Sequence, residues 1–301
     1  MKAGVLEFSY AGFAKSFAKV EAHSFYTTNL GDNAQTIAAR QLLERLHIAS
    51  SDIVGVDRDS LPAYAGEPVA LVMNGVFYDH NFPVPPAITP IFVGFCTKSE
   101  ALVHRYRDWF KRFEPIGCRD TATAHLMEAA GIAAIVTGCI TMTLPTRPRP
   151  PRKPRLLVVY GAGTGLLPPQ VLKHVPPELM DRAEFIHHRL PANEIPLSAA
   201  SRAWIERYEA HLIGRYRDEA QLVLTPLLHV ASPCLGMGVP VVLCRKDRDS
   251  RFGFLETMTR LYTPDAVAEI DWNPAPVDIS APVAFLIGQL RKRLAGALHG
   301  H

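Results

Sequence analysis

The chain has 301 residues, a length that suits two domains of about 150 residues each. Its hydrophobic content of 48% and charged content of 20% are those of an ordinary globular protein with a sizeable core. The net charge of +3 is too small for the strongly basic class of nucleic-acid-binding proteins, so we expect no nucleic-acid partner. A small anionic substrate, held by a few local cations, remains compatible with this charge.

The cysteines and the N-terminus favour a cytoplasmic protein. The five cysteines follow no zinc-binding or disulfide spacing, so we expect reduced thiols in apolar surroundings. Charged residues interrupt the apolar residues of the N-terminus, so we expect no signal peptide. Every apolar run stays below the roughly 18 residues that a membrane-spanning helix needs.

The polar stretch at residues 27–46 is predicted to be a loop followed by a helix. Asp32 is well placed as the N-cap of this helix, and Gln35, three residues later, would complete a capping box. This structural role in capping the helix accounts for Asp32 and Gln35 without a role in catalysis or ligand binding. It does not explain Asn29 and Asn33, which add two more polar groups at the end of an expected strand.

Short apolar segments alternate with amphipathic segments through the rest of the first half. Residues 68–75, 90–95 and 133–138 are β-branched, bounded by glycine or proline, and predicted to be strands. Residues 99–113 and 120–131 have the spacing of amphipathic helices. This alternation predicts a parallel sheet covered by helices on both faces.

Arg119 lies at a second transition from strand to helix, within residues 115–126. The free backbone N–H groups at a helix N-terminus attract anions, and an arginine beside them adds a positive charge. Arg119 is therefore either a surface residue or, as we favour, a clamp for an anionic ligand.

The segment RPRPPRKPR, residues 147–155, divides the chain. Its four prolines and five cations favour an extended connector, and we favour a solvated linker over a site for nucleic acid or anionic lipid. We therefore expect an N-terminal domain at residues 1–146 and a C-terminal domain at residues 156–280. An amphipathic helix and tail would follow at residues 281–301.

The second half repeats the alternating pattern of strands and helices. Its expected strands are residues 155–161, 183–190, 220–225 and 240–244. Two similar α/β halves would leave a cleft between them, and ligands of open parallel sheets bind beyond the carboxyl ends of the strands.

Two motifs of the second half could suggest a cofactor, but neither does. GAGTGL, residues 161–166, has Leu166 where a dinucleotide-binding fingerprint has its third glycine, so we expect no NAD site. His187 and His188 are neighbours on an expected strand and would point to opposite faces, so they cannot bind one metal together. We expect neither a metal nor a nucleotide cofactor.

His229 is the candidate catalytic residue, at the point where a strand gives way to a helix. Either Thr225 caps this helix with Pro226 as its first residue, or Ser232 caps it with Pro233 first and His229 lies in the loop. Both alternatives place the imidazole at a helix N-terminus suited to a phosphate or a carboxylate. The competing interpretation is a core histidine hydrogen-bonded to a carbonyl group.

Five motifs, in order along the chain, resemble those of the polysaccharide pyruvyl transferase family, and the resemblance runs nearly end to end. They are NLGDNAQTIAARQLL, LVMNGVFYDHNFPVPPAITPIFVGF, PIGCRDTATAHLMEAAGIAAIVTGCITMTL, LVLTPLLHVASPCLGMGVPVV and DSRFGFL. The resemblance implies an α/β fold of two facing Rossmann-like domains in a GT-B-like arrangement. It also implies transfer of the enolpyruvyl group from phosphoenolpyruvate to a sugar, giving a pyruvate ketal.

The C-terminal signature departs from the family at one position. The family has Arg-Leu-His where this chain has Leu227, Leu228 and His229. An arginine expected to hold the donor is therefore replaced by leucine, and Arg251 is a candidate substitute.

The resemblance gives each candidate residue a role. His229 would be the general acid. The donor would be held by Arg119, Arg251 and the N–H groups near Leu228, and the acceptor sugar would be faced by Asn29, Asp32 and Asn33. An acceptor precursor linked to a lipid would bring the protein to the inner membrane surface.

Two other functions remain open from the sequence. The same fold serves nucleotide-sugar glycosyltransferases, which would need a base-stacking pocket and acidic groups for the ribose. A protein that had lost activity with the family arginine would instead be a non-catalytic sugar-binding or scaffold protein.

Overall fold

The computed structural model describes residues 1–21 and 26–299, and the strands of the first half form two parallel sheets. One sheet has the order β3-β1-β4-β6 and the other has the order β5-β7-β8-β9. The strands of the first are β1 (Lys2–Glu7), β3 (Ile53–Asp57), β4 (Val69–Val72) and β6 (Ile88–Ile91). Those of the second are β5 (Gly75–Val76), β7 (Phe95–Cys96), β8 (Ile116–Cys118) and β9 (Ala134–Val136). The chain passes directly from β4 to β5 and from β6 to β7, so the second sheet continues the first.

The second half contains one parallel sheet of five strands in the order β11-β10-β13-β14-β15. These strands are β10 (Arg155–Tyr160), β11 (Ala183–His187), β13 (Ala220–Thr225), β14 (Val241–Cys244) and β15 (Leu261–Tyr262). Valine and leucine fill most of the buried positions of β10, β13 and β14, as expected for a parallel sheet that is covered on both faces.

Helices pack around both groups of strands. Those of the first half are α1 (Ala14–Glu21), α2 (Leu30–Arg45), α3 (Glu100–Arg105), α4 (Arg107–Lys111) and α5 (Thr121–Ala129). Those of the second half are α6 (Pro169–Leu172), α7 (Pro177–Met180), α8 (Ala199–Glu219), α9 (Leu228–Gly236) and α10 (Ser280–His299). None of the described helices is long and apolar enough to cross a membrane.

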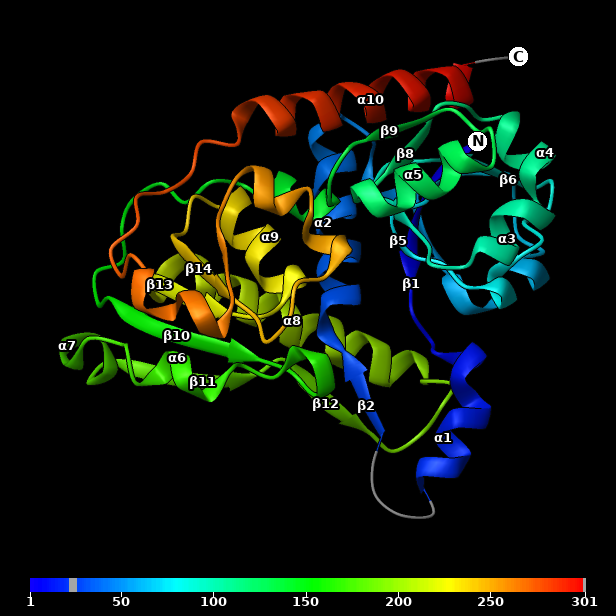
Figure 1. Ribbon diagram of the computed structural model, residues 1–301. Coiled ribbons are helices and arrows are strands. Elements are labelled where there is room, and N and C mark those ends of the chain that lie inside the picture. Colours follow the sequence, from blue (N-terminus) through cyan, green and yellow to red (C-terminus); the bar gives the residue numbers. More distant parts are fainter. Residues whose placement is uncertain (22–25, 300–301) are drawn as a thin grey trace.

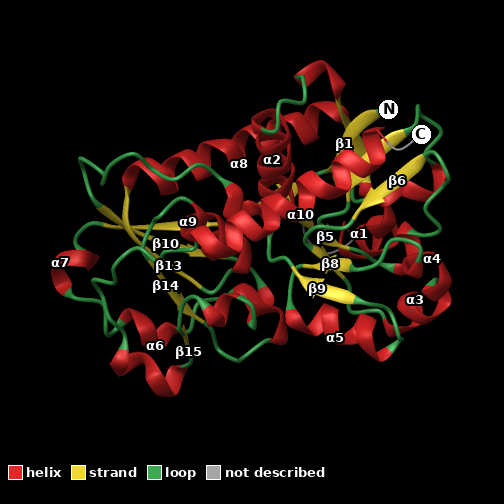
Figure 2. Ribbon diagram, turned by 90° about the horizontal axis from the view of Figure 1, so that it is seen from above, coloured by secondary structure: helices red, strands yellow, loops and turns green. Residues whose placement is uncertain are grey.

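Three elements join the two halves. Helix α2 packs against α8 and α9 of the second half, and Figure 2 shows it nearly end-on between the two groups of strands. Strand β2 (Tyr26–Asn29) pairs antiparallel with β12 (Arg189–Ala192), with Asn29 opposite Arg189. Helix α10 returns from the second half and contacts β4 and β6 of the first (Figure 1).

The hydrophobic core follows this arrangement. One cluster of buried residues runs through both halves and includes Leu6, Phe92, Leu235 and Leu290. A smaller cluster, which includes Leu156, lies on the other face of the C-terminal sheet. Because the main cluster crosses the interface, the halves are held together by apolar packing around α2 and α10 as well as by the β2–β12 pair.

The structure confirms the predicted fold class, since two Rossmann-like α/β units face each other as in a GT-B arrangement. Some local predictions were wrong. The strand expected at 90–95 is divided between β6 and β7, which belong to different sheets. The helix expected at 99–113 is divided at Tyr106, whose ψ of 22° leaves the helical range. The strand expected at 183–190 is two strands in different sheets, because the chain leaves β11 at His188 and enters β12 to pair with β2.

Candidate active site

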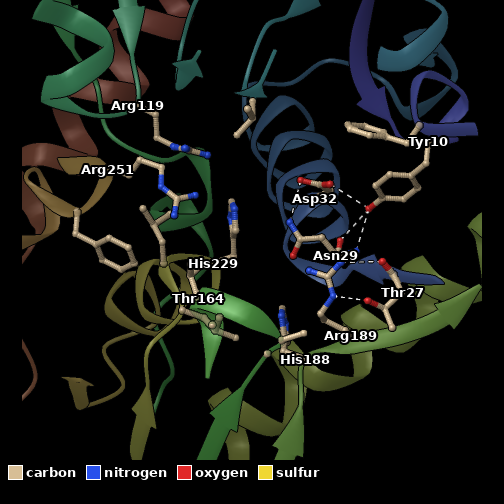
Figure 3. Close-up of a pocket in the computed structure, with 18 of the residues that line it drawn as sticks. Tyr10, Thr27, Asn29, Asp32, Arg119, Thr164, His188, Arg189, His229 and Arg251 are labelled. Carbon is tan, nitrogen blue, oxygen red and sulfur yellow. Dashed lines mark hydrogen bonds between the residues drawn. The ribbon is translucent and has the colours of Figure 1, made fainter. Parts of the chain in front are cut away.

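A cavity of about 300 Å³ lies between the halves, where loops and helix N-termini follow the ends of the parallel strands. We call it the central cavity, and its size suits a small-molecule ligand. One carboxylate and seven basic side chains are among the residues that line it: Asp32, Arg58, Arg119, Arg189, Arg245, Arg251, His188 and His229. This charge pattern favours an anionic ligand. Figure 3 shows the labelled residues around the cavity.

His229 is the second residue of α9, and it enters the central cavity from the C-terminal half. The helix begins at Leu228 with Leu227 as its N-cap, so neither predicted cap was right. Thr225 instead accepts a hydrogen bond at its Oγ1 from the Leu227 N–H, at 3.1 Å. The prediction that His229 lies in the first turn is confirmed, and the loop alternative is wrong.

The surroundings of His229 keep its imidazole neutral. Its Nδ1 atom is shielded from solvent and has no hydrogen-bond partner among the described residues. Burial lowers the pKa of His229 well below its usual value, and the positive charge of Arg119 lowers it further, with smaller effects of His188 and Arg251. An anion bound beside this ring would oppose these effects and raise the pKa.

A glycine of the opposite half lies against His229. A Cβ atom added to Gly31, in the first turn of α2, would lie 2.3 Å from the His229 Cβ and 2.4 Å from its Cγ. Any side chain at position 31 would therefore displace the imidazole or separate α2 from α9. The absence of a side chain at Gly31 lets the two helix N-termini meet.

Arg119 follows β8 and is only 3% exposed. Its backbone N–H donates to the Phe95 carbonyl at 2.7 Å, and its Nη2 atom donates to the Cys96 Sγ at 2.8 Å. The Nε atom lies 3.4 Å from an Asp120 carboxylate oxygen. Nη1 is buried and has no hydrogen-bond partner among the described residues. Because buried polar groups are rarely left unpaired, this atom points to a ligand that completes the site.

Two further arginines share one carboxylate at the same side of the cavity. The Arg251 guanidinium, in the short turn after β14, donates from Nε to both oxygens of Asp249, at 3.0 and 2.9 Å, and its Nη2 also contacts that carboxylate. Arg245 donates from Nη1 to the Pro226 carbonyl at 2.7 Å and lies 3.7 Å from Asp249. One carboxylate therefore faces two cations, which leaves a net positive charge.

The side chain of Leu227 packs against the glycine loop that follows β10. Its Cδ2 atom lies 2.8 Å from the position of a Cβ added to Gly165 and 3.3 Å from one added to Gly161. The glycine loop after β10 therefore packs against Leu227, and both line the central cavity. This loop is part of the site even though it lacks the dinucleotide fingerprint.

Asn29 and Asp32 reach the central cavity from the first half. Asn29 is the N-cap of α2, and its Oδ1 accepts from the Gly31 N–H at 3.2 Å. The capping prediction for Asp32 was therefore wrong, because the helix begins at Leu30 and places Asp32 in its first turn. The Asp32 carboxylate instead accepts hydrogen bonds from the Tyr10 hydroxyl at 3.0 Å and from the Asn29 side-chain amide at 3.3 Å.

Asn33 is separated from the other predicted site residues. It lines a second cavity of about 200 Å³, together with Glu7, Arg202 and Glu206. Asn33 is one residue along α2 from Asp32 and points to this second cavity rather than to the central one. The structure brings together the other six: Asn29, Asp32, Arg119, Leu228, His229 and Arg251.

Several lining residues were missed by the sequence analysis. Arg245 is the first residue after β14. Arg119 was predicted from the same position after a strand, so Arg245 could have been predicted in the same way. Arg189 donates to the hydroxyl and carbonyl oxygens of Thr27, at 2.6 and 2.8 Å, and this contact depends on the β2–β12 pairing. His188 pairs with the buried Glu209 at 3.1 Å. Within residues 1–21 and 26–299, no three His, Cys, Asp or Glu side chains gather as metal ligands would.

Comparison with known proteins assigns the chain to a family. No curated protein matches it significantly. A functionally uncharacterised protein from Klebsiella pneumoniae subsp. pneumoniae NTUH-K2044 is similar in structure, with 12% identity and a TM-score of 0.48 over 84% of this chain and 88% of that one. A putative UDP-N-acetylglucosamine 2-epimerase from Listeria monocytogenes is also 12% identical, with a TM-score of 0.45 over 100% of this chain and 98% of that one. The family model for polysaccharide pyruvyl transferase matches residues 29–247, which are well over half of the chain and include the first four motifs, while DSRFGFL lies just beyond them. The chain belongs to the polysaccharide pyruvyl transferase family.

Proposed function

We propose that this protein transfers the enolpyruvyl group of phosphoenolpyruvate to two hydroxyls of a polysaccharide or precursor sugar, forming a pyruvate ketal. The observation that carries the proposal is that two groups at the central cavity have buried nitrogen atoms without hydrogen-bond partners. The Nη1 of the Arg119 guanidinium and the Nδ1 of His229 are buried and have no hydrogen-bond partner within the described residues. An anion with both a carboxylate and a phosphate would give these groups partners.

The donor side is supported by the distribution of positive charge. Phosphoenolpyruvate carries a carboxylate and a phosphate. Arg119 and Arg251 lie on one side of the cavity in Figure 3, and Arg245 shares the Asp249 carboxylate with Arg251. The first backbone N–H groups of α9, near Leu228, have no acceptor within the helix. They form the positive end of the helix dipole, and Leu228 lines the central cavity. We assign the donor to this side.

His229 is the proposed general acid. Its pKa is low in the empty cavity, and an anionic donor beside it raises that pKa so that the ring binds a proton. The imidazolium then delivers its proton to the methylene carbon of the donor, and positive charge develops at the neighbouring carbon. A sugar hydroxyl adds to that carbon, phosphate departs, and a second hydroxyl closes the ketal.

The acceptor sugar is proposed to enter from the α2 side, where Asn29 and Asp32 line the cavity. We accordingly assign residues 1–146 to an acceptor domain and residues 156–280 to a donor domain, joined by the segment 147–155. A lipid-linked acceptor would place the protein at the inner membrane surface.

Ligand binding separates this proposal from its rivals. The thermal unfolding temperature should rise with phosphoenolpyruvate and stay unchanged with nucleotide sugars, because only a ligand that binds the folded state stabilises it. The Arg119→Ala variant should lose the shift, whereas Arg105→Ala, which removes an exposed arginine outside the cavity, should keep it. A shift with a nucleotide sugar and none with phosphoenolpyruvate would favour a glycosyltransferase instead. Donor turnover with a sugar acceptor would exclude a scaffold protein.

A further inference from the structure

Asp32 is the one carboxylate among the described residues that line the central cavity. It is 5% exposed and projects from the first turn of α2. In Figure 3 it lies on the side of the cavity opposite Arg119 and Arg251, with His229 between. The other histidine of the lining, His188, is already paired with Glu209. Asp32 is therefore the available proton acceptor on the side assigned to the sugar.

The hydrogen bonds around Asp32 can serve both of its protonation states. The Tyr10 hydroxyl lies 3.0 Å from the Asp32 Oδ2 and 3.1 Å from the Asn29 carbonyl oxygen, and it has one proton for these two acceptors. When Asp32 is ionised, Tyr10 donates to it. When Asp32 is protonated, Asp32 can donate to the Tyr10 oxygen, and Tyr10 can turn its proton to the Asn29 carbonyl. A carboxylate that exchanges protons during a reaction needs this tolerance.

Tyr10 is fixed in a position that suits this exchange. It follows β1 with a left-handed φ of 60°, and its backbone N–H donates to the Asp59 carboxylate at 3.0 Å. Its oxygen also accepts from the Asn29 N–H at 3.3 Å. The hydroxyl therefore remains beside Asp32 in either state.

Burial makes the Asp32 carboxylate a stronger base than an exposed one. Burial raises the pKa of Asp32, and the negative charge of Asp59 adds to this effect. Arg58, the Tyr10 hydroxyl and Arg119 act in the opposite direction, but the pKa remains raised. Burial and the charge of Asp32 also raise the pKa of Tyr10 well above its usual value, so Tyr10 keeps its proton.

We infer that Asp32 is the general base that removes the proton of the first acceptor hydroxyl, with Tyr10 as its positioning residue. The inference rests on the proposed function. As the hydroxyl oxygen bonds to the central donor carbon, Asp32 takes its proton while His229 protonates the methylene carbon. The carbon–oxygen bond to phosphate then breaks, and phosphate leaves with the proton held by Asp32. The proton of the second hydroxyl returns to His229, so both residues are restored and all protons balance.

The test compares Asp32→Asn, Asp32→Ala and Tyr10→Phe with wild-type protein and with Asp52→Asn, a control at an exposed aspartate outside the cavity. Phosphate release from phosphoenolpyruvate is measured with a methyl hexopyranoside whose 4- and 6-hydroxyls are free. Asp32→Asn should lower kcat at least about 100-fold while leaving the KM for phosphoenolpyruvate within about threefold. Formate should restore part of the activity of Asp32→Ala, because a small carboxylate can occupy the vacated space.

The pH profile distinguishes a base from a residue that only binds the sugar. The acidic limb of kcat/KM should disappear in Asp32→Asn. It should move to higher pH in Tyr10→Phe, because the Tyr10 hydrogen bond lowers the pKa of Asp32. A higher KM for the sugar with unchanged kcat, or no formate rescue, would overturn the assignment of Asp32. A wild-type protein that neither binds nor consumes phosphoenolpyruvate would overturn the proposed function, and the assignment with it.

Discussion

The two sides of the central cavity are built alike but carry opposite chemistry. Each begins with a strand and places its key side chain in the first turn of the following helix: His229 in α9 and Asp32 in α2. Burial lowers the pKa of His229 and raises that of Asp32, so it favours the neutral form of both. The difference lies in their partners. Asp32 has two hydrogen-bond donors, whereas the Nδ1 of His229 has no partner within the described residues.

This contrast indicates which of the two ligands, donor or acceptor, must bind first. The Asp32 side is organised by the protein alone, through Tyr10 and Asn29. On the His229 side, cations surround a neutral imidazole, and an anion is needed to balance them. We infer that the donor binds first and converts His229 into an acid, so that proton transfer does not begin in an empty site.

The largest expected effect is that of removing His229. In His229→Ala we expect kcat to fall by about 10²–10⁴, because a general acid is lost while the fold is retained. His187→Ala, at the exposed histidine of β11, is the matched control and should remain active. Turnover and thermal unfolding are measured together. A folded His229→Ala protein with near-normal turnover would restore the interpretation of a core histidine.

Gly31→Ala tests the contact between the two sides of the cavity, because it changes α2 at the point where that helix meets His229. The added methyl group would overlap the Cβ and Cγ of His229, so we expect the imidazole to shift and kcat to fall by up to roughly 100-fold. Gly214→Ala in α8 is the control, because nothing lies within 4 Å of a Cβ added there. The control should be active and as stable as wild type or more so. Equal activity of the two variants would show that contact between α2 and His229 has no catalytic importance.

Arg119→Ala sharpens the assignment of the donor side. Loss of a charge-assisted hydrogen bond should weaken phosphoenolpyruvate binding by about 1.5–3 kcal/mol, with a smaller effect on the acceptor. Calorimetric titration of the variant with each ligand measures the two changes. Because Arg119 is buried beside Asp120, thermal unfolding must be measured as well. Unchanged donor affinity in a folded variant would make Arg119 a structural residue.

The smallest effect is expected from restoring the family arginine. If Arg251 replaces the arginine missing at position 227, Arg251→Ala should weaken donor binding and Leu227→Arg should partly rescue it. The Leu227 side chain packs against the Gly161 and Gly165 loop, so the longer arginine must displace that contact, and rescue should be incomplete. A double-mutant cycle on donor affinity measures the coupling. Additive effects at the two positions would refute the replacement.

The alternation of strands and helices was enough to predict the α/β fold, because buried parallel strands have distinctive apolar runs. The residues at which helices begin were harder to predict. At α2, Asn29 and Asp32 are both good capping residues, and only the pairing of β2 with β12 decides that the helix starts after Asn29. At α9, Leu227 caps without a side-chain hydrogen bond, so no local signal marks the start.

The candidate site was predicted where a polar residue lies between a strand and the following helix or in the first turn of that helix, as at Arg119 and His229. Residues of the site were missed where their place in the cavity depends on contacts between distant parts of the chain. Arg189 enters the cavity because β12 crosses to β2, and Tyr10 because its left-handed backbone turns it toward Asp32. Asn33 was placed in the site by proximity in sequence, yet one step along the helix turns it to another cavity.

Calorimetric titration with phosphoenolpyruvate, in two buffers of different ionisation enthalpy near pH 7, tests the central claim most directly. Since the pKa of His229 is low in the empty cavity and should rise beside an anion, binding should be accompanied by proton uptake. The account predicts uptake by the wild-type protein and by His187→Ala, and its loss in His229→Ala. Absence of binding, or the same proton uptake in His229→Ala as in wild type, would contradict the claim that the donor binds at His229 and turns it into the acid.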